Sequence, residues 1–192
     1  YGFYPEALRW RVDLSFVLLA LAVVPVLYDK LPYRKYGLLY SAGFPIIAGW
    51  LLVGGLGLEP VDTDRFGGIM LTLILGVTGI TFSLPIGIAL ALGRLSNMPT
   101  LRTLCVFFIE FIRGVPLITL LFVASTMLNY FLPPGTVYAL LTRVLIIVTL
   151  FGSAYMAEVI RGGLQAISKG QHEAGDSLGL TYWQAQRLIM LP

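Results

Sequence analysis

The sequence predicts an all-α membrane protein, a polytopic bundle of about five transmembrane helices with a short helical segment on the cytoplasmic side. Of its 192 residues, 57% are hydrophobic and only 12% are charged, whereas about 25% of the residues in a soluble domain are charged. The mean hydropathy is +0.85. This composition excludes a soluble enzyme, a disordered tail and a secreted disulfide-bonded domain, and a net charge of +3 is too small to indicate nucleic-acid binding.

Runs without charged residues give the positions of the spans, because a helix needs about 20 apolar residues to cross a bilayer. The first run, Leu14–Tyr28, is short and needs Val12 and the flanking aromatic residues to reach that length. The other predicted spans are, in order, Tyr36–Leu58, Phe66–Gly93, Val115–Leu132 and Thr136–Ala157. The last two lie in one long apolar run that Pro133-Pro134-Gly135 interrupts.

The distribution of lysine and arginine predicts which connections face the cytoplasm. Nine of the 13 basic residues lie in three connections, 29–35, 93–113 and 158–192. The opposite side has only Arg9, Arg11 and Arg65, and Arg143 lies within the fifth span. We therefore place the three basic connections in the cytoplasm.

Two features, one in the third span and one in the connection that follows it, concern helix packing. Small residues recur every four positions in the third span: Gly79, Ser83, Gly87 and Ala91. Such a strip allows a second helix to approach closely, and a pore-lining role is the alternative interpretation. After this span, an apolar stripe predicts an amphipathic helix at the membrane surface: Leu101, Leu104, Cys105, Phe108 and Ile112. This helix would turn into the membrane at Gly114-Val115-Pro116, and Glu110 and Arg113 are spaced to pair on it.

The cytoplasmic segment after Ala157 carries two helix-start signals. Ser168 and Gln171 form the pattern of a capping box, and the helix that they open would run to Leu178 with Gly179 as a left-handed cap. Thr181 repeats the pattern with Gln184. Two capped short helices joined by a glycine turn predict a rigid projection of the kind used for docking. A DNA-binding helix-turn-helix is the alternative, but only Arg187 is basic in the second helix.

The same segment resembles the EAA loop of ABC importer permeases, in which Glu-Ala-Ala is followed at fixed spacing by Gly and by Ile-x-Leu-Pro. The matching residues are Glu173, Ala174, Gly175, Gly179, Ile189, Leu191 and Pro192, with Gly175 in place of the second alanine. Further upstream, the stretches 111–117, 154–163 and 169–171 resemble the polar amino acid uptake subfamily. The helices before Arg65 are similar to those of the general L-amino acid permeases of Gram-negative bacteria.

This resemblance implies a type I ABC importer permease that carries amino acids across the bacterial inner membrane. Residues 1–65 would be an N-terminal extension with two transmembrane helices. Residues 66–192 would be the permease core, incomplete at its C-terminus, with coupling helices at about 168–191. Because the chain opens on Tyr1 and closes directly after an apolar helical run, we expect an internal piece of a longer protein.

The resemblance also implies the partners of the chain. These are a cytoplasmic ATPase dimer, a periplasmic amino-acid-binding protein, the lipid bilayer and a second permease, which is either the same chain or, as we favour, a different one. Glu173 would be the charged contact with the ATPase, and Gly179 would set the angle between the two coupling helices. ATP hydrolysis would take place in the separate subunit, so that this chain would not be an enzyme.

Several single residues have two interpretations. Arg143 either contacts substrate on the translocation path or extends to the outer head groups. Glu158 and Arg161, like Glu110 and Arg113, form either conformational ion pairs or simple helix-end electrostatics. With a single histidine, His172, and without a GxxxxGK[ST] loop, we expect no metal site, no cofactor and no catalytic residue in this chain.

Two other classes of function remain as alternatives. A secondary transporter would need inverted repeats and paired intramembrane charges, and the sequence has neither. A membrane-anchored regulator with a cytoplasmic helix-turn-helix would need a basic recognition surface, which the second cytoplasmic helix lacks.

Overall fold

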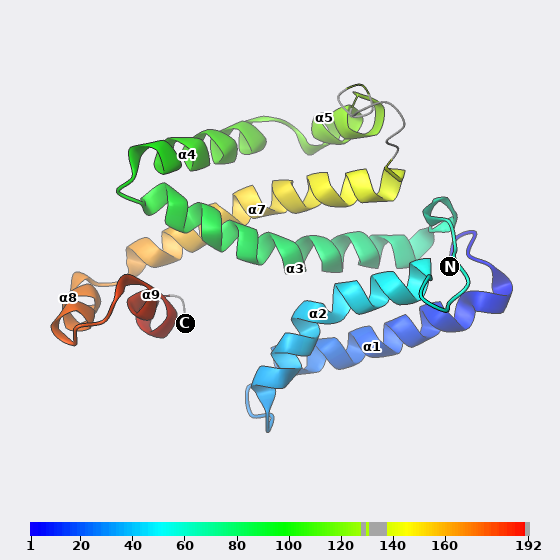
Figure 1. Ribbon diagram of the computed structural model, residues 1–192, viewed down its shortest axis with the longest axis horizontal. Helices are drawn as coiled ribbons and strands as arrows, with labels where there is room; N and C mark the ends of the chain where they lie inside the picture. Colours follow the sequence, from blue (N-terminus) through cyan, green and yellow to red (C-terminus); the bar gives the residue numbers. More distant parts are fainter. Residues whose placement is uncertain (128–129, 131–137, 191–192) are drawn as a thin grey trace. The chain divides into compact units, whose positions relative to one another are not determined.

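The computed structural model describes residues 1–127, 130 and 138–190, and the regular structure of this part is helical apart from an isolated bridge between Gly55 and Leu58. The main helices are α1 (Arg9–Leu27), α2 (Arg34–Val53), α3 (Gly68–Leu95), α4 (Pro99–Gly114), α5 (Leu117–Phe122), α7 (Leu140–Ala166), α8 (Lys169–Ser177) and α9 (Tyr182–Ala185) (Figure 1). The predicted all-α class is confirmed.

In the part of the chain that the structure describes, four helices are long and apolar enough to cross a membrane: Glu6–Leu27, Arg34–Val53, Gly68–Leu95 and Leu140–Ala166. A fifth candidate is the pair Pro99–Gly114 and Leu117–Met127, whose two helices are bent by 99°. The bend lies at the predicted turn, because Val115 and Pro116 both have extended backbone angles. The proline–glycine break at 133–135 and the end of the fourth predicted span lie outside the described residues.

The start of the first span differs from its prediction. Helix α1 begins at Arg9, five residues before Leu14, and therefore includes the charged residues Arg11 and Asp13. Arg11 is only 3% exposed, and its Nη1 donates a hydrogen bond to the carbonyl oxygen of Glu59 at 2.7 Å. A charged side chain that is hydrogen-bonded inside the protein does not end a helix. The charge-free run therefore predicted too short a first span.

Two other boundaries also differ. Helix α2 ends at Val53 rather than Leu58, because Gly54 (φ +85°) and Leu56 (φ +50°) adopt left-handed conformations that a helix cannot accommodate. Helix α7 continues nine residues past Ala157, to Ala166. The charged residues in this extension form ion pairs, described below, and do not terminate the helix.

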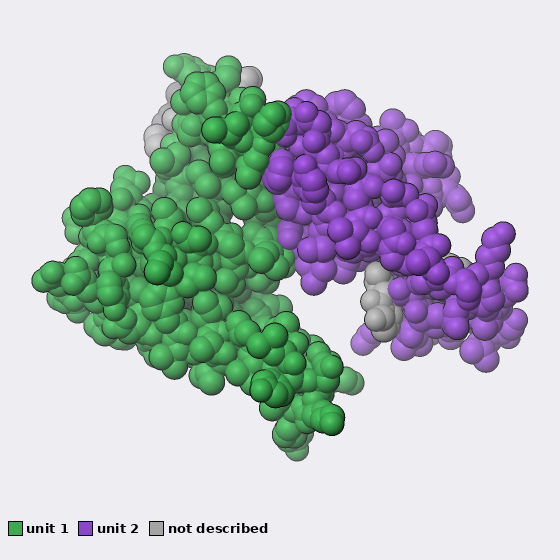
Figure 2. All heavy atoms as spheres, turned by 180° about the vertical axis from the view of Figure 1, so that it is seen from behind, with its two compact units in different colours: residues 1–82, 116–149 green, residues 83–115, 150–192 purple. Residues whose placement is uncertain are grey.

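The described chain divides into two compact units, Tyr1–Phe82 with Pro116–Thr149 and Ser83–Val115 with Leu150–Pro192 (Figure 2). In the first unit, α1 and α2 form a helical hairpin (Figure 1). The hydroxyl of Tyr40 donates to the carbonyl oxygen of Leu18 at 3.0 Å, and Ser41 donates to that of Ala22 at 2.5 Å. These bonds satisfy polar groups between two apolar helices, where water is not available.

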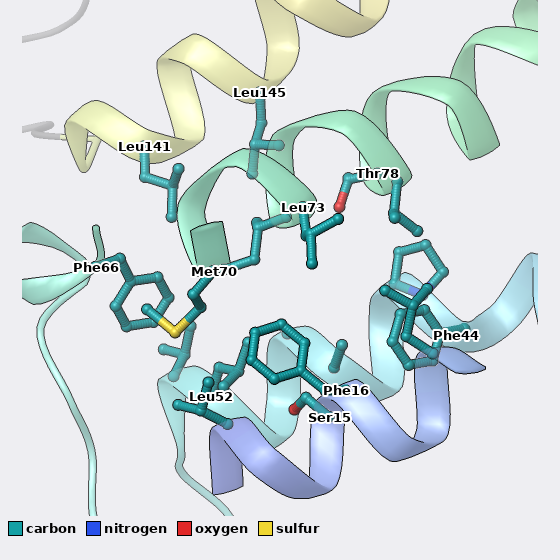
Figure 3. Close-up of a pocket in the computed structure, with 18 residues that line it drawn as sticks. Ser15, Phe16, Phe44, Leu52, Phe66, Met70, Leu73, Thr78, Leu141 and Leu145 are labelled. Carbon is teal, nitrogen blue, oxygen red and sulfur yellow. The ribbon is translucent and has the colours of Figure 1, made fainter. Parts of the chain in front are cut away.

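The core of the first unit consists of the buried residues Tyr4, Val12, Leu52, Val61, Phe66 and Met70. Next to it, an apolar pocket of about 140 Å³ lies between the α1–α2 hairpin and α3, with Leu141 and Leu145 of α7 on a further side (Figure 3). Its walls are almost entirely hydrocarbon, for example Phe16, Phe44 and Leu73. The N-terminal helices therefore pack on α3 through apolar contacts.

The small residues of α3 face α7, as the packing interpretation predicts. A Cβ atom on Gly87 would lie 2.8 Å from Cβ of Met156, closer than real Cβ atoms approach a neighbour. In the first unit, a Cβ atom on Gly79 would lie 3.3 Å from Cγ1 of Val148. Close helix approach without a large driving force from water requires such small residues.

The second unit is centred on Ala91 of α3, Ile109 of α4 and Ala157 of α7, each of which is 0% exposed. The buried face of α4 differs in part from the predicted stripe. Cys105 and Ile112 of the stripe are buried inside the protein, whereas Leu101 and Leu104 are 39% and 62% exposed. Ile109, which the predicted stripe did not include, is the residue of α4 that packs with the two alanines.

Candidate functional site

The projection that the sequence places in the cytoplasm consists of α8, α9 and the π-helical turn Gln186–Met190, and we call residues 168–190 the coupling segment. The capping box at Thr181 is confirmed, since its backbone N–H donates to Oε1 of Gln184 at 2.9 Å and its hydroxyl donates to the same atom at 3.0 Å. The capping box predicted at Ser168 is wrong in part. Ser168 is the N-cap residue, but its side chain makes no capping bond, and its carbonyl oxygen accepts the N–H of Gln171 at 3.1 Å.

The turn between α8 and α9 is a Schellman motif around Gly179. Gly179 has φ +68°, in the left-handed region. The N–H of Leu180 donates to the carbonyl oxygen of Gly175 at 3.2 Å, and the N–H of Gly179 donates to that of Asp176 at 3.0 Å. This pair of bonds defines the motif and fixes the direction in which the chain leaves the helix.

The two halves of the EAA-like motif meet in space. Gly175 is buried, and a Cβ atom there would lie 3.3 Å from Cδ1 of Ile189. A small residue at position 175 therefore allows the chain after α9 to pack against α8. Leu191 and Pro192, which complete the motif, lie outside the described residues.

The surface of the coupling segment combines an acidic group with large apolar side chains. Glu173 and Ala174 are exposed, and within the described part of the chain Glu173 forms no ion pair. The exposed apolar side chains are Leu178 (75%), Tyr182 (56%), Trp183 (72%) and Leu188 (63%). Exposed aromatic and aliphatic groups beside a charge without a partner are typical of a docking surface.

A cluster of charged residues lies in the second unit at the end of α7 that leads to the coupling segment. Oε1 of Glu158 accepts Nη1 of Arg94 at 2.5 Å, and Oε2 accepts Nε and Nη2 of Arg161 at 3.2 and 2.9 Å. Nη1 of Arg113 lies 3.7 Å from Oε2 of Glu158. The Glu158 side chain is only 16% exposed. One carboxylate thus ties together α3, α4 and α7.

The sequence predicted that Glu110 and Arg113 pair with each other on α4, but in the structure each of them pairs with a residue of another helix. Glu110 accepts Nη1 of Arg94 at 3.1 Å, and Arg113 extends toward Glu158 with its guanidinium 5.6 Å from the centre of the Tyr155 ring. Spacing along one helix could not identify Arg94, because it is 64 residues from Glu158 in the sequence. In the sequence, the only indication of a role for Arg94 was that it lies among the basic residues of the predicted cytoplasmic connection 93–113.

Arg143 is buried in the first unit, with 8% of its surface exposed. Its Nη1 donates to the carbonyl oxygen of Ser125 at 2.8 Å. The residue lines a cavity of about 670 Å³, whose other polar lining residues include Asp62, Asp64 and Tyr138. The sequence analysis did not predict that these acidic residues lie near Arg143. The concentration of acidic residues at 59–65 was the feature of the sequence that could have indicated it.

Among the described residues, no group of three or more histidine, cysteine, aspartate or glutamate side chains could hold a metal ion.

Comparison with known proteins identifies the relatives of this arrangement. Residues 83–192 match the family model described as binding-protein-dependent transport system inner membrane component. The chain is 50% identical to the inner membrane amino-acid ABC transporter permease protein YhdY of Escherichia coli K12, covering 100% of this chain and 53% of the relative. It is 45% identical to the glutamate/glutamine/aspartate/asparagine transport system permease protein BztC of Rhodobacter capsulatus, covering 100% of this chain and 57% of the relative.

A solved structure gives the same similarity in three dimensions. The chain resembles one from the crystal structure of an amino acid ABC transporter with histidines, with a TM-score of 0.56 and 34% sequence identity over 65% of this chain and 57% of the other. The chain spans about half the length of the curated relatives that it matches.

Proposed function

Because this chain belongs to the family of binding-protein-dependent transport system inner membrane components, we propose that it is part of the permease subunit of an ATP-driven importer of amino acids. It is a multi-pass protein of the bacterial inner membrane. The amino acid substrate class is inferred from the names of the relatives, both of which are amino acid permeases.

The observation that carries this proposal is the construction of the coupling segment. A permease without ATPase activity of its own needs a stiff element that transfers the motion of a partner to the membrane helices. The Schellman turn at Gly179, the capping box at Thr181 and the contact of Gly175 with Ile189 each remove a degree of freedom from this segment. The charged cluster at Glu158 joins the preceding helix to α3 and α4.

The proposed partners follow from this role. A cytoplasmic ATPase dimer would bind the coupling segment, with Glu173 as the charged contact. A second permease, which we favour as a different chain, would complete the pathway, and a periplasmic binding protein would deliver the amino acid. In this proposal residues 1–65 form an N-terminal extension, and residues 66–192 belong to the permease core with coupling helices at about 168–191.

The docking role of Glu173 is tested in the full-length protein by the substitution Glu173→Lys. Reversal of a charge at an interface weakens association by about tenfold or more. We expect Glu173→Lys to remain in the membrane, to retain much less ATPase on purification and to lose amino acid uptake.

The matched control is Gln171→Lys, which also places a lysine on α8, at an exposed position about 200° around the helix. We expect this variant to retain the ATPase as the wild type does. Equal ATPase retention and equal uptake in Glu173→Lys and the wild type would contradict the proposed docking surface.

A further inference from the structure

We propose that the cavity beside Arg143 binds the zwitterionic head group of an α-amino acid, with the carboxylate on Arg143 and the ammonium group near Asp62 and Asp64. The inference rests on the proposed import function and adds the chemistry by which the permease itself recognises its substrate. The cavity volume of about 670 Å³ is in the range of small-molecule sites. All of its lining residues belong to the first unit.

Arg143 supplies the positive charge among the residues that line this cavity. Its Nη1 donates to the carbonyl oxygen of Ser125, and no residue that the structure describes accepts a hydrogen bond from its buried Nε. A guanidinium group binds a carboxylate through charge-assisted hydrogen bonds, so Arg143 is the lining residue that would hold the carboxylate of the ligand.

The two aspartates give the site its second pole. Asp62 and Asp64 are exposed, and neither forms an ion pair with any residue that the structure describes. Arg143 is buried and the two aspartates are exposed, so the lining carries a buried positive charge and two exposed negative charges. A zwitterion that enters with its carboxylate first meets complementary charges at both ends.

The remaining lining determines which part of the ligand is recognised. The other walls are mostly apolar, with Leu71, Leu75 and Val144 among them. The charged residues of the lining are the three already named. The site therefore selects the α-amino and α-carboxyl groups and discriminates weakly between ligand side chains, which is the behaviour of a site for amino acids as a class.

The test uses the full-length permease in its purified complex with the ATPase, without the binding protein, in lipid nanodiscs. The probe is radiolabelled glutamine, and its saturable binding is measured with competitors. We expect alanine to compete, whereas butylamine and butyrate, which each lack one pole, compete poorly. Arg143→Gln and the double variant Asp62→Asn/Asp64→Asn should each weaken binding by about tenfold to a hundredfold.

Arg11→Gln is the matched control for the structural role of a buried arginine. Like Arg143, Arg11 is more than nine-tenths buried, donates Nη1 to a backbone carbonyl and has a buried Nε without a hydrogen-bond partner, but it does not line this cavity. We expect Arg11→Gln to lower thermal stability while leaving the dissociation constant for glutamine within about twofold of the wild type.

Three results would overturn the inference: wild-type complex without saturable glutamine binding, Arg143→Gln that binds as the wild type does, or equal losses of binding in Arg143→Gln and Arg11→Gln. Uptake by the complete transporter separates this inference from the function on which it rests. Wild-type transporter that imports no amino acid would contradict the proposed function, whereas wild-type import with unchanged import by Arg143→Gln contradicts the binding site alone.

Discussion

Glu158 offers the sharpest test of how the membrane helices are held together next to the coupling segment. The substitution Glu158→Gln keeps the size of the side chain but removes the negative charge that Arg94, Arg113 and Arg161 share. The carboxylate is 16% exposed and accepts three hydrogen bonds from guanidinium groups. After the substitution, three positive charges would face one another with only Glu110 left to offset them.

The magnitude follows from the number and burial of these bonds. A hydrogen bond to a charged group contributes about 1.5–3 kcal/mol, and removal of one partner from a buried ion pair costs about 3–5 kcal/mol. The arginine side chains are 21–35% exposed, so that solvent reduces the penalty. We therefore expect a loss of about 3 kcal/mol in the free energy of unfolding. For a domain of this size, that loss lowers Tm by about 6–12 °C.

Glu110→Gln is the matched control, because the Glu110 side chain is 54% exposed and, among the residues that the structure describes, forms an ion pair only with Arg94. An exposed ion pair contributes about 0–1 kcal/mol, so Tm should change by at most about 4 °C. Thermal unfolding of both variants in nanodiscs, together with amide hydrogen exchange in α4, measures the difference. Equal shifts in Tm for Glu158→Gln and Glu110→Gln would refute the conclusion that Glu158 is the central residue of the cluster.

Two further predictions concern glycines. Gly179→Val should cost about 1–3 kcal/mol at the turn, because φ is +68° while the space around the Cβ position is empty. Uptake per amount of protein in the membrane should fall for this variant. It should fall much less for Gly179→Asn, because asparagine tolerates the left-handed conformation. Equal uptake by the two variants would show that the backbone angle is not required. Gly87→Ala should destabilise by about 1–3 kcal/mol, because the added methyl group meets Met156. Gly76→Ala on the same helix, where the space is open, should leave Tm unchanged or raise it, and a similar decrease in Tm for both would contradict the close packing of α3 on α7.

The features that the sequence predicted correctly are those set by local rules. Charge-free runs located the spans because the cost of a charge in hydrocarbon acts on each helix separately. The turn at Gly179 and the capping box at Thr181 were predictable because a cap involves residues only three to five positions apart. The small residues of α3 predicted close packing, although the sequence did not identify α7 as the partner.

Tertiary structure alone decided the surroundings of the buried charges. Arg11 lies within a membrane helix because the backbone of Glu59, 48 residues away, accepts its hydrogen bond. Arg94 pairs with Glu158 across 64 residues, and the cavity beside Arg143 includes acids from a distant loop. The energy of a charge depends on the groups and the solvent within a few ångströms of it, and residues far apart in the chain supply those groups only after folding.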